Sequence, residues 1–286
     1  MKTLLTLGHG YSASAVAARL IPQGWNVIGT CRDENRADTL RAAGVQPLMW
    51  PGDLGPALTA ASHILISAAP DAGGDPFLRA AGDALRKANP TWVGYFSTTA
   101  VYGDHQGAWV DEDTPVTPQS DRARHRVLAE QQWLNTPLPV HIFRLAGIYG
   151  PGRGPFVKVR EGSARRVIKP GQVFSRIHVD DIAETVLASI ARPNPHRIYN
   201  VCDNDPAPPE DVLSHAAALL GLPEPPAIPY DQADMTPMAR SFYGESKRVS
   251  NARILTELQV KLNHPTYREG LASLLAAETL NPDAPK

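Results

Sequence analysis

The chain has few of the features that mark secreted, membrane or nucleic-acid-binding proteins. Its 286 residues include only two cysteines, Cys31 and Cys202, which are too few for a disulfide framework and favour a reduced, cytoplasmic setting. No stretch is apolar over the length that a membrane-spanning helix requires, so we expect no membrane association. The net charge of −1 gives no basis for binding a polyanion, and we expect no nucleic-acid partner. The histidines and cysteines also lack metal-ligand spacing, which predicts no metal site.

The N-terminal segment lacks the features of a signal peptide. It reads MKTLLTLGHG, a short apolar run that ends at glycines and has no small-residue cleavage site, so we interpret it as a strand. A hydrophobic content of 43% is ordinary for a globular protein with a sizeable core. The length fits one large domain or a core domain with a smaller lobe.

Short apolar runs alternate with alanine-rich segments of helical periodicity in the first half of the chain. The runs predict strands at Thr3–Leu7, Asn26–Thr30, Gln46–Trp50, His63–Ser67, Trp92–Ser97 and Val140–Arg144. The segments between them predict helices at Ala13–Ile21, Asn35–Ala43, Pro76–Ala88 and Asp121–Leu134. Because regular β-α-β alternation with fully apolar strands is typical of a parallel sheet covered on both faces, the sequence predicts an α/β fold with a Rossmann-type doubly wound sheet.

The pattern loosens after Arg144. Further strands are predicted at Ile177–Val179 and Arg197–Cys202, and further helices at Asp180–Ala191, Glu210–Leu220, Ser246–Leu258 and Tyr267–Thr279. We predict a Rossmann core of residues 1–148 plus about 176–202. The remainder, about 149–175 plus 203–286, is predicted to form a smaller C-terminal α/β substrate lobe.

A glycine-rich turn follows the first predicted strand. It reads Gly8-His9-Gly10-Tyr11-Ser12-Ala13 and runs directly into a predicted helix, which is the strand–turn–helix context of a dinucleotide-binding G-x-G-x-x-A motif. Gly8 permits a tight turn, Gly10 lets the backbone approach a diphosphate, and Ala13 allows close packing of helix on strand. The six residues are therefore predicted to bind the cofactor.

The end of the second strand indicates which dinucleotide binds. Its first charged residue is Arg32, whose guanidinium can pair with a 2′-phosphate, and Arg36 could assist. We therefore predict NADP(H); the alternative is NAD(H), which Asp33 would favour. Further cofactor contacts are predicted at Ser67, Ala68 and Ala69 after the fourth strand, and at Asp53, which could equally cap a helix.

Several segments spread over nearly the whole chain share a family pattern. They read GHGYSASA, YFSTTAVYGD, RLAGIYGPGR, RIHVDDIAETV, ESKRVSNARI and PTYREGL. Together they resemble the extended short-chain dehydrogenase/reductase superfamily, the group of NAD-dependent epimerases and dehydratases for nucleotide sugars. The resemblance implies a nicotinamide cofactor, a Rossmann core, a small substrate lobe and a cleft between them.

The resemblance also implies a catalytic pair that this sequence does not contain. Family members carry a tyrosine, and a lysine four residues later, on the helix after the VYG segment. Aligning that helix on Ala129-Glu130 places Arg122 at the tyrosine position and Arg126 at the lysine position. Arginine can replace lysine as a cation beside the cofactor ribose, so Arg126 is a predicted cofactor contact, but it is a poor proton donor.

Other residues are candidates for the chemistry. Thr98 stands at the family's serine/threonine position, and it could orient a substrate oxygen together with Thr99 or cap its own backbone. Tyr102 is the nearest phenol and could be a displaced acid or pack beside the cleft. Arg153 could clamp a substrate phosphate or carboxylate, or it could face solvent.

The RIHVDD segment is predicted to be structural, with Asp180 capping the next helix rather than joining His178 and Asp181 in catalysis.

Two functions follow from the sequence. One is an NADP(H)-dependent oxidoreductase, epimerase or dehydratase acting on a small polar or sugar-like substrate. The other is a non-catalytic NADP(H) sensor or scaffold, which would explain the absence of the catalytic tyrosine and lysine. The helices Pro76–Ala88 and Asp121–Leu134 commonly form a dimer interface in relatives, so a homodimer is possible.

Overall fold

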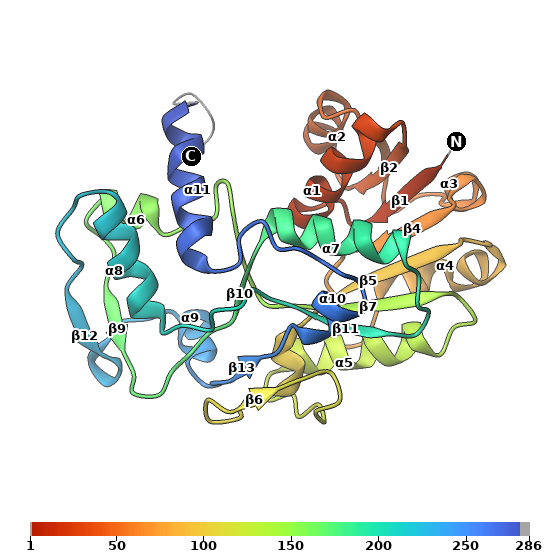
Figure 1. The fold of residues 1–286 in the computed structure, drawn as a ribbon. Helices are drawn as coiled ribbons and strands as arrows, with labels where there is room; N and C mark the ends of the chain where they lie inside the picture. Colours follow the sequence, from red (N-terminus) through yellow and green to blue (C-terminus); the bar gives the residue numbers. More distant parts are fainter. Residues whose placement is uncertain (1, 281–286) are drawn as a thin grey trace.

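Seven parallel strands form the central sheet of the computed structural model, which describes residues 2–280 (Figure 1). The strands are β1 (Thr3–Leu7), β2 (Asn26–Cys31), β3 (Gln46–Met49), β4 (His63–Ile66), β5 (Trp92–Thr98), β7 (Val140–Leu145) and β11 (Ile198–Val201). Their order is β11-β7-β5-β4-β1-β2-β3, so the chain winds outward from β1 in one direction and then returns to continue in the other. Sheets of this kind hold ligands where the order reverses, at the carboxyl ends of the strands.

Helices cover both faces of this sheet, which confirms the predicted doubly wound α/β fold. The face built on α1 (Tyr11–Leu20), α2 (Glu34–Ala42) and α7 (Val179–Ala191) has one buried apolar cluster. The opposite face is covered by α3 (Gly55–Ala60), α4 (Pro76–Lys87) and α5 (Asp121–Leu134) and has a second cluster. Side chains along β5 point alternately to the two faces of the sheet, so β5 contributes to both clusters. Trp92 and Phe96 belong to the first cluster, and Val93 and Tyr95 belong to the second.

A third, smaller apolar cluster lies beside the sheet, on the left in Figure 1. Its helices are α6 (Phe156–Arg160), α8 (Pro209–Leu219) and α11 (Tyr267–Leu280), accompanied by the paired strands β9 (Arg166–Ile168) and β12 (Ala227–Pro229). The pair β8 (Gly147–Tyr149) and β10 (Arg176–His178) joins this region to the sheet. The smaller C-terminal lobe is thus present, while the residue boundaries of the two predicted domains stay a prediction.

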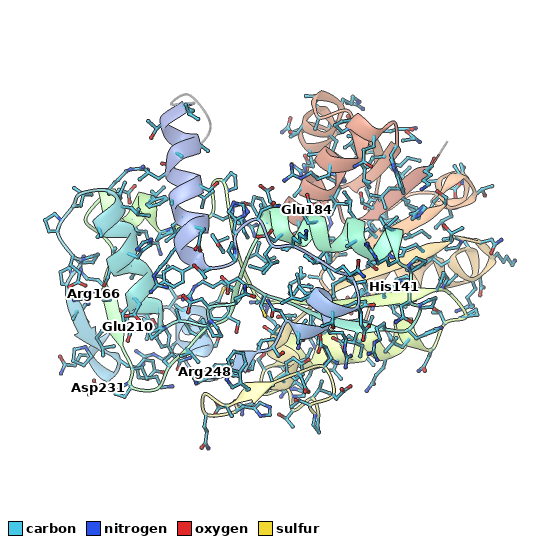
Figure 2. The ribbon with its side chains drawn as sticks, in the orientation of Figure 1. His141, Arg166, Glu184, Glu210, Asp231 and Arg248 are labelled. Carbon is cyan, nitrogen blue, oxygen red and sulfur yellow. The ribbon has the colours of Figure 1, made fainter. Side chains whose placement is uncertain are left out.

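The predicted helix over Ser246–Leu258 is wrong in its first half. Residues Arg248–Val249 form strand β13, which pairs with β6 (Trp109–Val110), and the helix α10 spans only Ala252–Thr256. The Lys247 ammonium donates to the Gly103 carbonyl at 2.6 Å, and Arg248 donates to the carbonyl of Gly107. Arg248 lies between the lobe and the sheet in Figure 2. Tertiary hydrogen bonds of this kind outweigh a weak local helix preference.

The remaining short elements are η1 (Ile21–Gln23), η2 (Thr99–Tyr102), η3 (Tyr230–Gln232) and α9 (Pro237–Phe242). None of the helices within residues 2–280 combines the length and the apolar character needed to cross a membrane.

Candidate functional site

The turn between β1 and α1 leaves space and free hydrogen-bond donors for an anionic group. Gly8 has a φ of +86°, and a Cβ there would lie 2.8 Å from the Ala68 backbone nitrogen, so only glycine fits. A Cβ on Gly10 would meet nothing closer than 4.0 Å. The helix α1 begins at Tyr11, and no side chain caps its first amides. These amides and the positive end of the helix dipole are what a diphosphate requires.

Hydrogen bonds from β2 and α2 hold this turn in place. The Gly8 N–H donates to Thr30 Oγ1 at 2.7 Å, and the Arg36 guanidinium donates to the His9 carbonyl at 3.0 Å. The His9 ring is buried beneath the turn, where its Nδ1 lies 2.7 Å from Thr6 Oγ1. Burial and the nearby Arg36 charge lower the pKa of His9 to about 4. His9 is therefore neutral and supports the turn. Arg36, which was predicted to assist in binding the 2′-phosphate, instead holds the backbone of the turn through the His9 carbonyl.

The end of β2 carries an available cation. Arg32 is exposed, and within residues 2–280 neither a hydrogen bond nor an ion pair fixes its guanidinium. The neighbouring Asp33 is the N-cap of α2, and its carboxylate accepts from the Arg36 N–H at 2.8 Å. The acidic residue at this strand end is therefore occupied by the helix, whereas the basic residue is free.

The remaining predicted cofactor contacts take two different positions. Ser67, Ala68 and Ala69 follow β4, and Ala68 lies directly against Gly8. Asp53 is exposed before α3, where its carboxylate accepts from the Gly55 N–H at 2.8 Å. This bond closes a turn ahead of α3, whose N-cap is Leu54 without a side-chain cap, and the adenine contact of Asp53 stays a prediction.

Arg126 and Arg122 stand at the two positions of the missing catalytic pair. The Arg126 guanidinium donates to the carbonyls of Ala68 and Phe96, so α5 places a positive charge at the carboxyl ends of β4 and β5. Arg122 is exposed one turn earlier on the same helix. The two arginines thus differ: Arg126 faces the sheet edge that holds the turn, whereas Arg122 faces solvent.

Thr98 and Thr99 lie half-buried where β5 ends and η2 begins. Thr98 Oγ1 accepts from the Ala100 N–H at 3.2 Å and so caps η2. Among the described residues, neither threonine hydroxyl donates a hydrogen bond to another group. The capping alternative is therefore present, and the hydroxyl proton of Thr98 remains available at the same time.

Tyr102 is buried in the interior, and this corrects its predicted role as a displaced acid. The residue is 0% exposed, and its hydroxyl donates to Asn200 Oδ1 at 2.8 Å while accepting from Arg144 at 2.9 Å. Burial raises the pKa of the phenol to about 12. A substrate cannot reach a side chain enclosed in this way. Tyr102 therefore has a packing role, which was the alternative to its role as an acid.

The Tyr102 hydroxyl belongs to a buried polar network that the sequence analysis missed. Arg144 of β7 forms an ion pair with Glu130 of α5 at 2.8 Å, and both side chains are 5% exposed. Glu130 also accepts from the Ser97 hydroxyl at 2.5 Å. The network ties β5, β7 and α5 together directly beneath Thr98. The available signal was an arginine inside the apolar VHIFRL strand, since buried arginines require partners.

Arg153 lies against the glycine-rich turn. Its guanidinium stacks over the Tyr11 ring at 4.4 Å, and the Tyr11 hydroxyl donates to the Pro151 carbonyl at 2.9 Å. The loop after β8 is thereby strapped across the start of α1. The predicted substrate clamp of Arg153 stays a prediction, and its guanidinium is exposed at this position.

The RIHVDD segment has the predicted structural role with one correction. His178, and not Asp180, is the N-cap of α7, because its Nδ1 accepts from the Asp180 N–H at 3.2 Å. The Asp181 carboxylate is 0% exposed and accepts from the backbone N–H groups of Asn263 and His264. Nowhere in residues 2–280 do three or more histidine, cysteine, aspartate or glutamate side chains form a group that could hold a metal ion.

The chain is similar in sequence and in fold to several known proteins. The model of the NAD dependent epimerase/dehydratase family matches residues 79–202. A solved structure of a functionally unknown conserved protein from Silicibacter pomeroyi DSS is 59% identical, covers 97% of this chain and 99% of that chain, and has a TM-score of 0.94. A putative NAD-dependent epimerase/dehydratase from Methylobacillus flagellatus is 29% identical over 97% and 98% of the two chains, with a TM-score of 0.72. Protein YeeZ of Escherichia coli K12 is 29% identical over 93% of this chain and 97% of its own length.

Two more distant proteins carry informative names. A human epimerase family protein, SDR39U1, solved with NADPH, shares the fold at 18% identity, with a TM-score of 0.77 and coverage of 96% and 99%. A 3-diazoavenalumate denitrifying reductase from Streptomyces is 28% identical over 57% of this chain and 58% of its own length.

Proposed function

Because this chain belongs to the NAD dependent epimerase/dehydratase family, we propose that it is an NADP(H)-dependent oxidoreductase. Its substrate is a small polar or sugar-like molecule, and its catalytic set is not the standard one. The observation that carries the proposal is the open turn at Gly8–Ala13 with a free Arg32 at the neighbouring strand end. The NADPH complex of the human protein, the NAD complexes of other proteins with this fold and the reductase name of the Streptomyces relative support a nicotinamide cofactor.

The residues present fit a phosphorylated dinucleotide. The first amides of α1 would hold the diphosphate, and the Arg126 guanidinium would lie beside the nicotinamide ribose. Arg32 would pair with the 2′-phosphate, because it is the exposed cation at this strand end, while Asp33 uses one carboxylate oxygen to cap α2. NAD(H) is the alternative, and it would leave Arg32 without a partner.

Hydride transfer is the chemistry that the nicotinamide supplies when it is bound. The protein must then orient the substrate and manage one proton. We propose that the Thr98 hydroxyl donates a hydrogen bond to the substrate carbonyl oxygen, which holds that oxygen in place and stabilises negative charge on it. Since Tyr102 is enclosed, the proton that completes the alcohol comes from water.

Cofactor fluorescence tests the proposal directly. NADPH is titrated into the protein, and the nicotinamide signal is then followed while a broad panel of carbonyl compounds is added. Loss of the signal in the presence of one compound supports the oxidoreductase. Saturable NADPH binding without turnover across the whole panel would instead favour the non-catalytic sensor, which the absence of the tyrosine–lysine pair would explain.

Replacing Arg32 with alanine is expected to weaken NADPH binding about tenfold and to leave NADH binding unchanged, because the lost contact is a charge-assisted bond to the 2′-phosphate. Arg41→Ala is the matched control, since Arg41 is also exposed on α2 but pairs with Asp38. Dissociation constants for both cofactors check this assignment. An equal loss for NADPH and NADH would overturn the choice of cofactor.

Replacing Thr98 with alanine is expected to lower kcat/KM about 100-fold once a substrate is known, which is the typical effect of removing an oxyanion donor. NADPH affinity should stay the same. Thr98→Ser keeps the hydroxyl and the cap of η2 and should restore most of the activity. If the alanine variant turns over at the wild-type rate, Thr98 has no part in the chemistry.

A further inference from the structure

A cavity of about 350 Å³ lies between the loop after β8 and the helix α11. One wall is apolar and aromatic and is formed by Ile148, Val212, Tyr267 and Leu271. The polar lining consists of Tyr149, Arg153 and Arg176. The lining itself contains two arginines and no carboxylate, and the carboxylates that act on Arg176, Asp203 and Asp205, lie outside it.

A buried hydroxyl without a partner borders this cavity. Tyr149 is 8% exposed, and its Oη has no hydrogen-bond partner among the described residues. The ring packs onto α11 at Gly270, where a Cβ would come within 2.0 Å of the hydroxyl. Buried polar atoms are nearly always hydrogen-bonded, so an unsatisfied hydroxyl beside an open cavity points to a ligand group.

Arg176 has unused donors at the same place. Its Nη1 donates to the carbonyls of Phe174 and Ala207 at 2.9 and 3.1 Å, and no carboxylate within residues 2–280 forms an ion pair with it. The guanidinium lies 6.0 Å from the ring centres of Phe174 and Tyr267. Burial lowers the pKa of this arginine because the charged form loses hydration, and the nearby charges of Asp203 and Asp205 offset part of that effect.

We propose that this cavity binds a small organic anion. Its carboxylate or phosphate is held by Arg176 and the Tyr149 hydroxyl, and its apolar body lies against Tyr267, Val212 and Leu271. Bidentate pairing with a planar anion is the interaction that a buried guanidinium makes best. The site goes beyond the proposed function, because it uses none of the residues assigned to the cofactor or to Thr98.

The binding test uses the full chain without any dinucleotide. Isothermal titration calorimetry is performed with cinnamate and with phenyl phosphate, which distinguish a carboxylate ligand from a phosphate ligand, and with neutral cinnamamide. We expect saturable binding of at least one anion and none of the amide. Failure of both anions, or equal binding of the amide, would overturn the proposal.

Tyr149→Phe is the decisive variant because it removes only the orphan hydroxyl. We expect affinity for the bound anion to fall about tenfold, while thermal stability is unchanged or higher because an unsatisfied buried group is lost. Tyr199→Phe is the matched control, since Tyr199 is also a fully buried tyrosine but lies in the sheet core, away from the cavity. Unchanged anion affinity in Tyr149→Phe would contradict the site.

Arg176→Gln should abolish anion binding, but its loss could also disturb the fold, so circular dichroism accompanies it. NADPH titration of Tyr149→Phe keeps the two proposals separate. We expect normal NADPH binding in this variant. If the wild-type chain binds the anion but not NADPH, only the proposed function fails; if it binds NADPH but neither anion, only this site fails.

Discussion

Replacing Arg144 with methionine should reduce the free energy of unfolding by about 3–5 kcal/mol, the usual cost of removing one partner of a buried ion pair. The Glu130 carboxylate would remain at 5% exposure without its cation. It would keep only the hydrogen bond from Ser97. Tyr102 would lose the donor that now satisfies its oxygen, which adds to the cost.

Denaturant unfolding of the variant measures this loss. Arg124→Met is the matched control, because Arg124 pairs with Asp121 on the same helix at 2.6 Å but is 52% exposed. Exposed pairs contribute about 0–1 kcal/mol, so the control should unfold close to the wild type. If both variants lose the same stability, the buried network does not hold β5, β7 and α5 together in the way described.

The second large effect is a loss of stability between neutral pH and pH 5. Burial lowers the pKa of His9, His63, His141 and His178 to about 4 in each case. The unfolded chain, with histidine pKa values of about 6.5, binds these protons more readily than the folded one. Stability is therefore complete above about pH 6.5 and falls as the pH drops towards 4, by up to about 2 kcal/mol per histidine at pH 5.

Buried carboxyl groups act in the opposite direction. Burial raises the pKa of Asp75, Glu112 and Glu210. Burial raises the pKa of Asp203 to about 7, so its ionised form costs stability above that pH and its protonated form is favoured below it. These carboxyl groups offset part of the histidine effect. All four histidines contribute a loss of stability over this pH range, so the net result remains destabilisation on acidification, measured as the free energy of unfolding from pH 7.5 to about 5.

His178→Asn isolates one of the four contributions. Asparagine is a good N-cap, so the start of α7 is kept while the titrating ring is removed, and the acid-induced loss should shrink by about 2 kcal/mol. His196→Asn is the control, since His196 is exposed at a φ of 67° that asparagine tolerates. A His178→Asn protein that loses as much stability as the wild type would contradict this assignment.

Local patterns predicted the sheet and the turn well. The strand Thr3–Leu7 and the helix Asp121–Leu134 have the predicted bounds, because alternation, capping residues and helical periodicity are encoded in adjacent residues. Adjacent residues also placed a glycine turn between this strand and a helix, although α1 begins at Tyr11 and not at the predicted Ala13. The use of this turn as a cofactor site stays a proposal.

Long-range contacts account for what the sequence analysis missed. Tyr102 looked available because its partners Arg144 and Asn200 lie 42 and 98 residues away. The segment Ser246–Leu258 looked helical because its hydrogen bonds to Gly103 and Gly107 also join distant parts of the chain. The cavity beside Tyr149 could not be predicted, since its lining residues come from separate segments between Ile148 and Leu271.

The strap formed by Tyr11 and Arg153 gives the two proposed sites a common wall. Arg153 lines the cavity beside Tyr149, and it also stacks on the first residue of α1. An anion that draws this guanidinium into the cavity takes it away from Tyr11. Any resulting change in dinucleotide affinity must be matched by an equal change in anion affinity, because linkage between two binding equilibria is reciprocal. Arg153 is the residue through which such a coupling would pass, because it contacts both the cavity and α1.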